Sequence, residues 1–158
     1  MVIRRAKLQD LPALVELFKE FIDYNARYQG YFSRTSVTHE HWRQMTADAL
    51  EKPDCLVLVA EDEWGIVGFC TAGVQENPPV YKLPRHGFIR ELAVTRSCRR
   101  EGIGSELFRR AEQWLTGQGI SRLELHVAEG NPVSQTFWET LGFKTFIKRM
   151  AKDYPKSR

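Results

Sequence analysis

The sequence lacks the long hydrophobic runs of a membrane protein. Its longest uninterrupted apolar stretch, Cys55–Ala60, is far too short to cross a bilayer. The first ten residues, MVIRRAKLQD, contain no apolar core of a secretory signal. We therefore expect a chain without a membrane span, whose first residues belong to the fold and whose compartment is the cytoplasm.

Cysteine is scarce and metal-ligand patterns are missing. The three cysteines, Cys55, Cys70 and Cys98, do not have the spacing of zinc ligands, and a cytosolic location favours reduced thiols. Arginines surround Cys98, but no partner His or Asp is recognisable nearby, so a catalytic cysteine is not expected. His39 and His41 lie on a polar segment and are more typical of solvated side chains. We expect no metal site.

The charge balance has no strong excess of either sign. The 158 residues carry a formal net charge of +3, with 42% hydrophobic and 27% charged residues. This is the composition of an ordinary globular protein, long enough for a core of its own, and we expect residues 1–158 to form one domain. A small positive excess tolerates an anionic ligand, while no recognisable DNA- or RNA-binding motif is present.

Hydrophobic periodicity predicts strands and helices in an interleaved order. The expected strands are residues 2–5, 55–60, 66–74, 88–94, 122–127 and 143–150. The expected helices run from about 11 to 22 behind Asp10 as N-cap, from 39 to 50, from 102 to 117, and from 132 to 141 behind Asn131 as N-cap. This order predicts an α/β (α+β) fold in which helices pack on the faces of a mixed sheet.

The segment "RREGIG" between an expected strand and an expected helix is suited to hold an anion. A helix start presents unpaired backbone N–H groups and the positive end of the helix dipole, and Gly102 and Gly104 carry no Cβ that would keep an anion away. Arg99 and Arg100 add positive charge. A P-loop would need Gly-Lys-Ser/Thr here, and a dinucleotide fingerprint would need glycine in place of Leu107. Taken alone, the motif is also compatible with a tight turn beside solvated arginines.

Two motifs together resemble the GNAT superfamily of acetyl-coenzyme A dependent N-acetyltransferases. The family signature Arg/Gln-x-x-Gly-x-Gly/Ala is matched by Arg99, Gly102 and Gly104, with the strand residues "LAV" at the expected distance before it. A second family block is matched by "NPVSQTFWETLGF", residues 131–143. The resemblance implies the GNAT fold, a central and mostly antiparallel sheet with helices on both faces and a splay between the two central strands.

The resemblance also implies where acetyl-coenzyme A binds as co-substrate. The pyrophosphate is expected on the turn formed by Arg99, Arg100, Gly102, Ile103, Gly104 and Ser105. The pantetheine arm is expected along the strand residues Leu92, Ala93 and Val94, where two strands move apart. Asn131, at the far side of the splay, is a candidate both for the cap of its helix and for a cofactor contact.

Acetyl transfer to an amine needs a group that removes a proton, and Glu91 is the candidate base. Family members often carry this glutamate one position earlier, where this chain has Arg90. A shift of one residue reverses the face of a regular strand, although a bulge could restore it. Alternatively, Glu91 is a surface or ion-paired strand residue. His126 and His86 are lesser candidates, each more typical of a structural or solvated imidazole.

Trp138 stands where the family commonly has a tyrosine that protonates the departing thiolate. An indole N–H is a hydrogen-bond donor but not a useful acid. Trp138 is therefore a candidate for holding the thiol end of the cofactor or, equally, for a core aromatic. Four tyrosines elsewhere could supply a proton, but the sequence places none of them: Tyr24, Tyr28, Tyr31 and Tyr81.

The acceptor is expected at two variable segments, residues 24–41 and 75–87, which are aromatic and basic. They do not resemble an acidic cradle for a polyamine or aminoglycoside and favour a neutral or anionic amine, although they could equally be solvated loops.

The leading hypothesis is an enzyme that acetylates a primary amine of a small molecule or protein by direct attack in a ternary complex, with a homodimer as an option. A catalytically degenerate domain that binds acyl-coenzyme A as a sensor is the alternative, supported by Arg90 and Trp138. A nucleic-acid-binding module ranks far behind.

Overall fold

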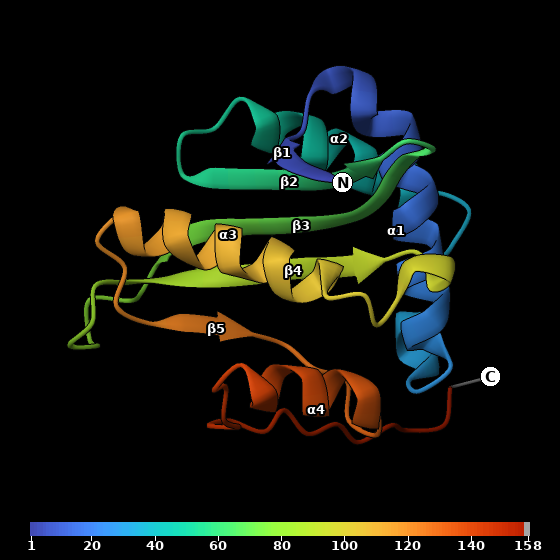
Figure 1. Cartoon of the computed structure of the whole chain (residues 1–158). Coiled ribbons are helices and arrows are strands. Elements are labelled where there is room, and N and C mark those ends of the chain that lie inside the picture. Colours follow the sequence, from blue (N-terminus) through green and yellow to red (C-terminus); the bar gives the residue numbers. More distant parts are fainter. Residues whose placement is uncertain (157–158) are drawn as a thin grey trace.

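A five-stranded sheet forms the centre of the computed structural model, which describes residues 1–156. The strands follow one another in space in sequence order, β1 to β5 (Figure 1). Their bounds are β1 Val2–Arg5, β2 Cys55–Asp62, β3 Gly65–Glu76, β4 Arg85–Val94 and β5 Leu123–Leu125. All neighbouring strands pair antiparallel except β4 and β5, which are parallel. The expected fold class, mixed and mostly antiparallel, is confirmed.

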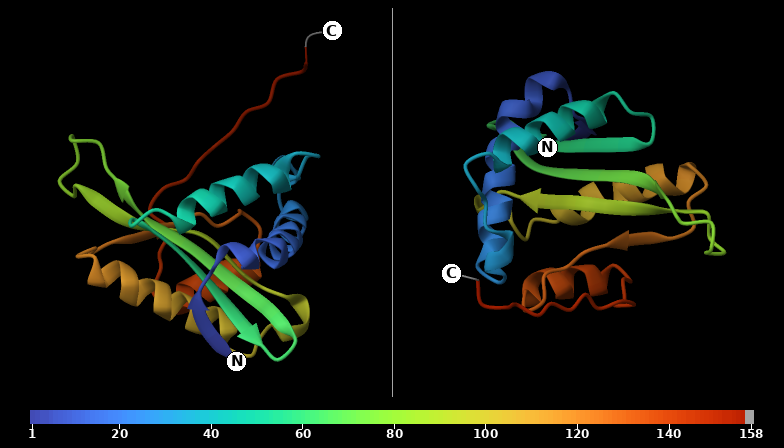
Figure 2. Two further views of the ribbon diagram at one scale, coloured as in Figure 1. Left: turned by 90° about the horizontal axis from the view of Figure 1, so that it is seen from above. Right: turned by 180° about the vertical axis from the view of Figure 1, so that it is seen from behind.

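Within residues 1–156, four α-helices cover the two faces of this sheet. They are α1 Leu11–Ala26, α2 Thr38–Leu50, α3 Ile103–Gly117 and α4 Pro132–Thr140, with short 3-10 turns at η1 Leu8–Asp10, η2 Gly30–Phe32 and η3 Arg96–Cys98. Helices α1 and α2 lie on one side of the sheet and α3 on the other (Figure 2, left). Because β2 and the middle of β3 are covered on both faces, residues 55–60 and 67–73 are buried, and these two stretches are mainly apolar in sequence.

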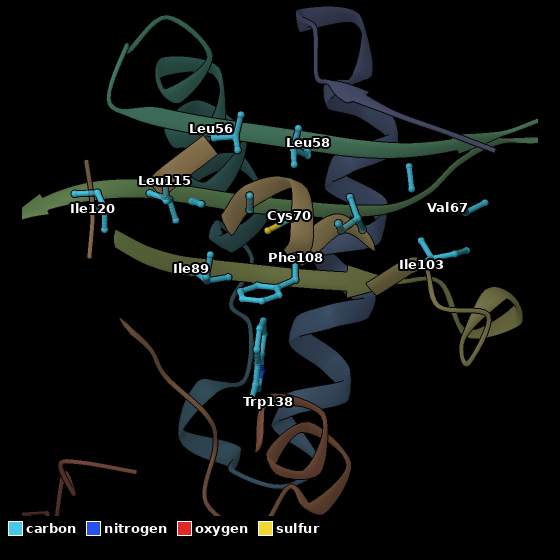
Figure 3. Close-up of a cluster of buried hydrophobic side chains, with 14 residues drawn as sticks. Leu56, Leu58, Val67, Cys70, Ile89, Ile103, Phe108, Leu115, Ile120 and Trp138 are labelled. Carbon is cyan, nitrogen blue, oxygen red and sulfur yellow. The ribbon is translucent and has the colours of Figure 1, made fainter. Parts of the chain in front are cut away.

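The core is divided by the sheet into two clusters. One joins α1 and α2 to β2 and β3, and Phe18 of α1 stacks on Trp42 of α2 with ring centroids 4.2 Å apart. The other joins α3 and α4 to the opposite face (Figure 3). In that cluster Phe108 of α3 and Trp138 of α4 make an edge contact at 5.6 Å between ring centroids. These aromatic contacts hold α4 beside α3, where the sheet itself offers α4 little area.

A β-bulge and a splay shape β4. Thr71 of β3 pairs with Glu91, but the next residue, Ala72, pairs with Ile89, so Arg90 has no partner in the register. On the other side, pairing of β4 with β5 ends at Ile89 and Leu125, although β4 continues to Val94. Beyond Ile89, the backbone groups on this edge of β4 are therefore not paired with β5.

The expected last strand, residues 143–150, is wrong, because the structure assigns no strand after β5 within residues 1–156. Phe143 contacts the rings of Phe108 and Trp138, and Phe146 lies against Arg122 just before β5, with the Arg122 Cζ 4.5 Å from the ring centre, yet this segment pairs with no strand. Beyond this anchor Phe146, Ile147 and Met150 are exposed, and the segment extends away from the body (Figure 2, left). The alternating pattern alone does not make a strand when no partner lies opposite it.

The start of α1 differs in detail from the expected cap. Asp10 stands at the N-cap position, but its side chain makes no capping bond to α1. It accepts two hydrogen bonds from the Arg4 guanidinium, at 2.8 and 3.0 Å, and one from the Lys7 N–H at 2.7 Å. The carboxylate therefore ties β1 to η1. Among residues 1–156, none of the helices has the length and hydropathy needed to cross a membrane.

Candidate active site

The turn between β4 and α3 presents free backbone N–H groups. Arg100 and Gly102 both have left-handed backbone conformations, with φ of 68° and 81°. Gly102 is the N-cap of α3, and its carbonyl accepts the first bond of the helix from Glu106 N–H at 3.0 Å. The N–H groups of Ile103, Gly104 and Ser105 precede that first bond and point out of the helix start. This geometry and the helix dipole suit a phosphate group.

Gly104 has a reason of its own to lack a side chain. A Cβ there would lie 3.3 Å from Leu92 Cδ2 and 3.5 Å from Phe137 Cζ. Gly104 therefore lets the first turn of α3 pack tightly against β4 and α4. At Gly102, by contrast, nothing lies within 4 Å of a Cβ, and the positive φ alone favours glycine.

The side chain of Arg99 is bound to α1 and not directed at the turn's N–H groups. It donates to Glu20 Oε1 at 3.2 Å and to the Val94 carbonyl at 3.0 Å, and its Cζ lies 4.8 Å from the centre of the Tyr24 ring. Glu20 also accepts from the Arg96 N–H at 2.9 Å and from Thr95 Oγ1 at 3.2 Å. The glutamate thus anchors the whole connection between β4 and α3. Sequence reasoning missed Glu20, because it lies 75 residues or more from its partners.

The splay between β4 and β5 encloses a small cavity of about 50 Å³. Leu92 and Arg90 border it from β4, residues 125–128 from β5 and the chain after it, and Trp138 from α4. Beyond Ile89, β4 has no strand partner on this side among residues 1–156, so an extended chain can add to its backbone groups. Of the residues expected to bind pantetheine, Val94 has its carbonyl already engaged by Arg99.

Asn131 and Trp138 both have structural roles in α4. Asn131 is 1% exposed and caps the helix, accepting from Ser134 N–H at 3.1 Å, while its amide nitrogen lies 3.5 Å from Asn25 Oδ1 of α1. The expected capping role is confirmed. Trp138 packs against Phe108, Phe137 and Phe143 and also borders the splay cavity. The two functions proposed for Trp138 are therefore compatible.

Glu91 faces the side of the sheet covered by α1 and α2. Glu91 pairs with Thr71 of β3, which lies two residues from Phe69 and therefore on the same face of the strand. Phe69 lies in the core beneath these helices. The Thr71 hydroxyl donates to Glu91 Oε2 and accepts from the Glu91 N–H at 3.2 Å. The bulge at Arg90 directly precedes Glu91, and Glu91 borders a second, larger cavity of about 420 Å³.

Burial raises the pKa of Glu91 above the ordinary glutamate value. Hydrogen bonds from Thr71 and Trp42 and the charge of Arg90 act in the opposite direction without cancelling the effect of burial. Arg90 itself lies over Gly73, with Nη2 3.0 Å from the position of a Cβ there. A carboxylate with a raised pKa is a better proton acceptor than an ordinary surface glutamate.

The other candidate side chains either have a structural role or lie beside the splay cavity. His86 is buried and its Nδ1 lies 2.8 Å from Asn77 Oδ1 at the closed end of the splay, which indicates a structural role. His126 borders the splay cavity and contacts the Phe88 ring. Burial raises the pKa of the Cys70 thiol, which makes it unreactive. Among residues 1–156, no three His, Cys, Asp or Glu side chains are grouped as a metal would require.

Comparisons with known proteins identify the family and the fold of the chain. The Dictyostelium discoideum N-terminal acetyltransferase complex ARD1 subunit homolog is 36% identical over 100 residues, which are 61% of this chain and 46% of that protein. The chain spans less than half the length of the curated relatives it matches. Among solved structures, a mutant of the BH1408 protein from Bacillus halodurans superposes with a TM-score of 0.85 at 21% identity, over 98% of this chain and 100% of that one.

The coenzyme A complex of an aminoglycoside N-acetyltransferase, AAC(6')-Iy, has a TM-score of 0.72 at 17% identity, over 98% of this chain and 100% of that one. At such identities the structures show the fold alone. The model of the acetyltransferase (GNAT) family matches residues 14–143, which include β2 to β5, the turn before α3 and all of α4. The chain therefore belongs to the acetyltransferase (GNAT) family.

Proposed function

We propose that the chain is an N-acetyltransferase that moves an acetyl group from acetyl-coenzyme A to a primary amine by direct attack in a ternary complex. One observation carries the proposal. Two cavities lie on either side of the same stretch of β4: Arg90 borders the splay cavity and Glu91 borders the larger one. The two cavities are also flanked by successive turns of α1, at Phe21 and Phe18 respectively. This arrangement suits two substrates that meet at β4.

The residues around the splay fit acetyl-coenzyme A. We assign the pyrophosphate to the free N–H groups of Ile103, Gly104 and Ser105, which the left-handed turn at Arg100 and Gly102 leaves open. The pantetheine arm would lie along β4 at Leu92, Ala93 and Val94, with Trp138 as the far wall. Arg99 would contribute by holding the turn to α1, as its contacts with Glu20 and Tyr24 suggest.

Glu91 would act as general base from the larger cavity. An acceptor enters mostly as an ammonium ion, and it must lose a proton to Glu91, directly or through water, before its nitrogen can bond to the thioester carbonyl carbon. The carbon–sulfur bond then breaks, coenzyme A leaves as the thiolate, and the nitrogen gives up its second proton to the thiolate or to water, which leaves a neutral amide. A thiolate is only mildly basic, so the reaction does not require the tyrosine that Trp138 replaces. The side chain of Glu91 in a cavity, and not on the surface, favours this enzyme over the sensor alternative.

The test separates cofactor binding from folding. Ser105→Asp places a carboxylate in the first turn of α3, where it favours the helix dipole but repels a pyrophosphate. We expect acetyl-coenzyme A to raise the melting temperature of the wild type and of the neutral control Ser105→Asn, but not that of Ser105→Asp. Ser105→Asp should keep the melting temperature of the free protein. No rise in the wild type would overturn the assignment of the site.

Catalysis is then measured as thiol release from acetyl-coenzyme A over a panel of primary amines. We expect at least one amine to raise the release rate well above the rate with water alone. Binding of acetyl-coenzyme A without acceleration by any amine would favour the sensor and contradict the proposed enzyme.

A further inference from the structure

The residues that line the larger cavity indicate the kind of ligand that it suits. It lies between α1, α2 and β4 and measures about 420 Å³, a volume ordinary for small-molecule sites. Apolar side chains form half of its wall: Phe18, Val37, Trp42 and Met45. The remaining lining residues are Thr35, Thr38, His41 and Glu91, and within residues 1–156 Glu91 is the one carboxylate that borders the cavity. We call this space the acceptor cavity.

Two apolar side chains at the edge of the acceptor cavity are exposed to solvent. Val37 is 66% exposed and Met45 is 53% exposed, although both face a cavity whose inner wall is the stacked pair Phe18 and Trp42. Exposed apolar residues that converge on one cavity are typical of a binding site for an apolar group, because they lose contact with water only when the ligand is present. An apolar occupant therefore explains both the rim and the wall.

The charges around the acceptor cavity favour an occupant with a single ammonium group. Glu91 can accept one ammonium, and its Thr71 and Trp42 contacts hold it in place. A second ammonium of a polyamine would find no further carboxylate in the wall, and Arg90 adds positive charge beside Glu91. A free carboxylate on the acceptor would have no arginine or lysine partner in the wall either, because none of the lining residues is arginine or lysine.

We infer that the acceptor is a monoamine whose amino group is attached to an uncharged apolar group, aromatic or aliphatic. The inference rests on the proposed function and deepens it. The ammonium would lie at Glu91 and the apolar group between the Phe18–Trp42 pair and the rim residues Val37 and Met45. The same chemistry is found in small arylalkylamines and at the N-terminus of a peptide that begins with a large apolar residue.

The experiment compares kcat/KM across amines in the thiol-release assay. Ethylamine to hexylamine form a series in which each methylene should raise kcat/KM by up to about fourfold, the factor expected for burial of one methylene. Phenethylamine and a peptide amide with N-terminal phenylalanine distinguish the two sources, while spermidine, an aminoglycoside and free phenylalanine carry the extra charges. We expect phenethylamine or the peptide to exceed the charged acceptors by at least about tenfold, the effect of one unpaired polar contact.

A pair of variants on α2 ties this preference to the acceptor cavity. Met45→Glu adds a carboxylate at the rim and should lower kcat/KM for hexylamine while raising it for spermidine. Gln44→Glu adds the same charge at the neighbouring exposed position, which does not border the cavity, and should leave the ratio unchanged. Equal or better use of spermidine by the wild type, or a flat alkylamine series, would overturn the inference and leave the proposed function standing. Thiol release that no amine accelerates would overturn both.

Discussion

Glu91 and Thr71 face each other across β4 and β3 and exchange two hydrogen bonds, from the Thr71 hydroxyl to the Glu91 carboxylate and from the Glu91 N–H to the Thr71 hydroxyl oxygen. This pairing holds the carboxylate toward the acceptor cavity. It exists because Arg90, the preceding residue, is the extra residue of a bulge. The position of the candidate base thus depends on a local irregularity of the strand.

Replacement of this carboxylate should slow catalysis. Glu91→Gln keeps the shape of the side chain but cannot accept a proton, so we expect kcat to fall by about 10²- to 10⁴-fold, the usual contribution of a general base. The rise in melting temperature with acetyl-coenzyme A should persist. Glu63→Gln, in the exposed turn between β2 and β3, is the matched control and should behave as the wild type. An unchanged kcat in Glu91→Gln would remove Glu91 from the mechanism.

The pH dependence of kcat/KM should also identify Glu91 as the base. Glu91 must be ionised to act as a base, and its pKa is raised by burial. As the pH falls through this raised pKa, kcat/KM of the wild type should decline, at a higher pH than an ordinary glutamate would give. Glu91→Gln should lack this acidic limb, and a pH profile of both proteins with one amine measures the difference.

In Glu91→Gln, stability near neutral pH should rise although activity falls. Because the pKa of Glu91 is raised in the folded protein, its protonated form is favoured there. The contribution of Glu91 to stability is present below the unfolded pKa and is lost as the pH rises through the folded pKa. At pH 7 to 8 we therefore expect Glu91→Gln to be more stable than the wild type, by a few degrees in melting temperature, with the gap closing near pH 4. Urea unfolding at both pH values provides a second measurement, and a less stable variant at pH 8 would contradict this account.

Glu20 is expected to support cofactor binding without touching the cofactor. Glu20→Gln removes the charge that holds the Arg99 guanidinium and weakens the bonds to Thr95 and Arg96. We expect the KM for acetyl-coenzyme A to rise by about tenfold, equivalent to roughly 1.4 kcal/mol, within the range for a hydrogen bond to a charged group, while kcat stays near its original value. Glu16→Gln, one turn earlier on α1, is the control. A fall in kcat at constant KM would show a different role.

Gly102 tests the geometry of the turn itself. Its φ of 81° is unfavourable for a β-branched residue, and nothing else would contact a Cβ there. We expect Gly102→Val to lower the free energy of unfolding by about 1–2 kcal/mol through backbone strain, and Gly102→Asn to cost less, since asparagine tolerates this conformation. Equal stability of the two variants in urea unfolding would mean that the turn relaxes to another conformation.

The sequence predicted the elements that its periodicity marks. The strand at residues 2–5 was predicted with its observed bounds, and the start of α4 behind Asn131 followed from the Asn-Pro pair. The predicted strand at residues 122–127 is real but shorter, at Leu123–Leu125, because β5 diverges from β4 after the third pair. The strand expected at 143–150 is absent: Phe143 packs against Trp138 of α4, and no residue of this segment pairs with a strand.

The candidate site, like the fold, could be predicted only in part. Local patterns pointed to the turn before α3, and the resemblance to the family pointed to Glu91. The residues that control them come from elsewhere: Thr71 from β3, Trp42 from α2 and Glu20 from α1. No spacing in the sequence marks such partners, because they become neighbours only through the tertiary fold.

Two of the four tryptophans border different cavities, Trp42 the acceptor cavity and Trp138 the splay cavity. Trp64 is exposed in the turn between β2 and β3, and Trp114 lies on α3 beside Arg5. The protein therefore contains an intrinsic fluorophore beside each proposed substrate. With Trp64 and Trp114 replaced by phenylalanine, changes in emission of the remaining two would follow the order in which the substrates arrive, without any label.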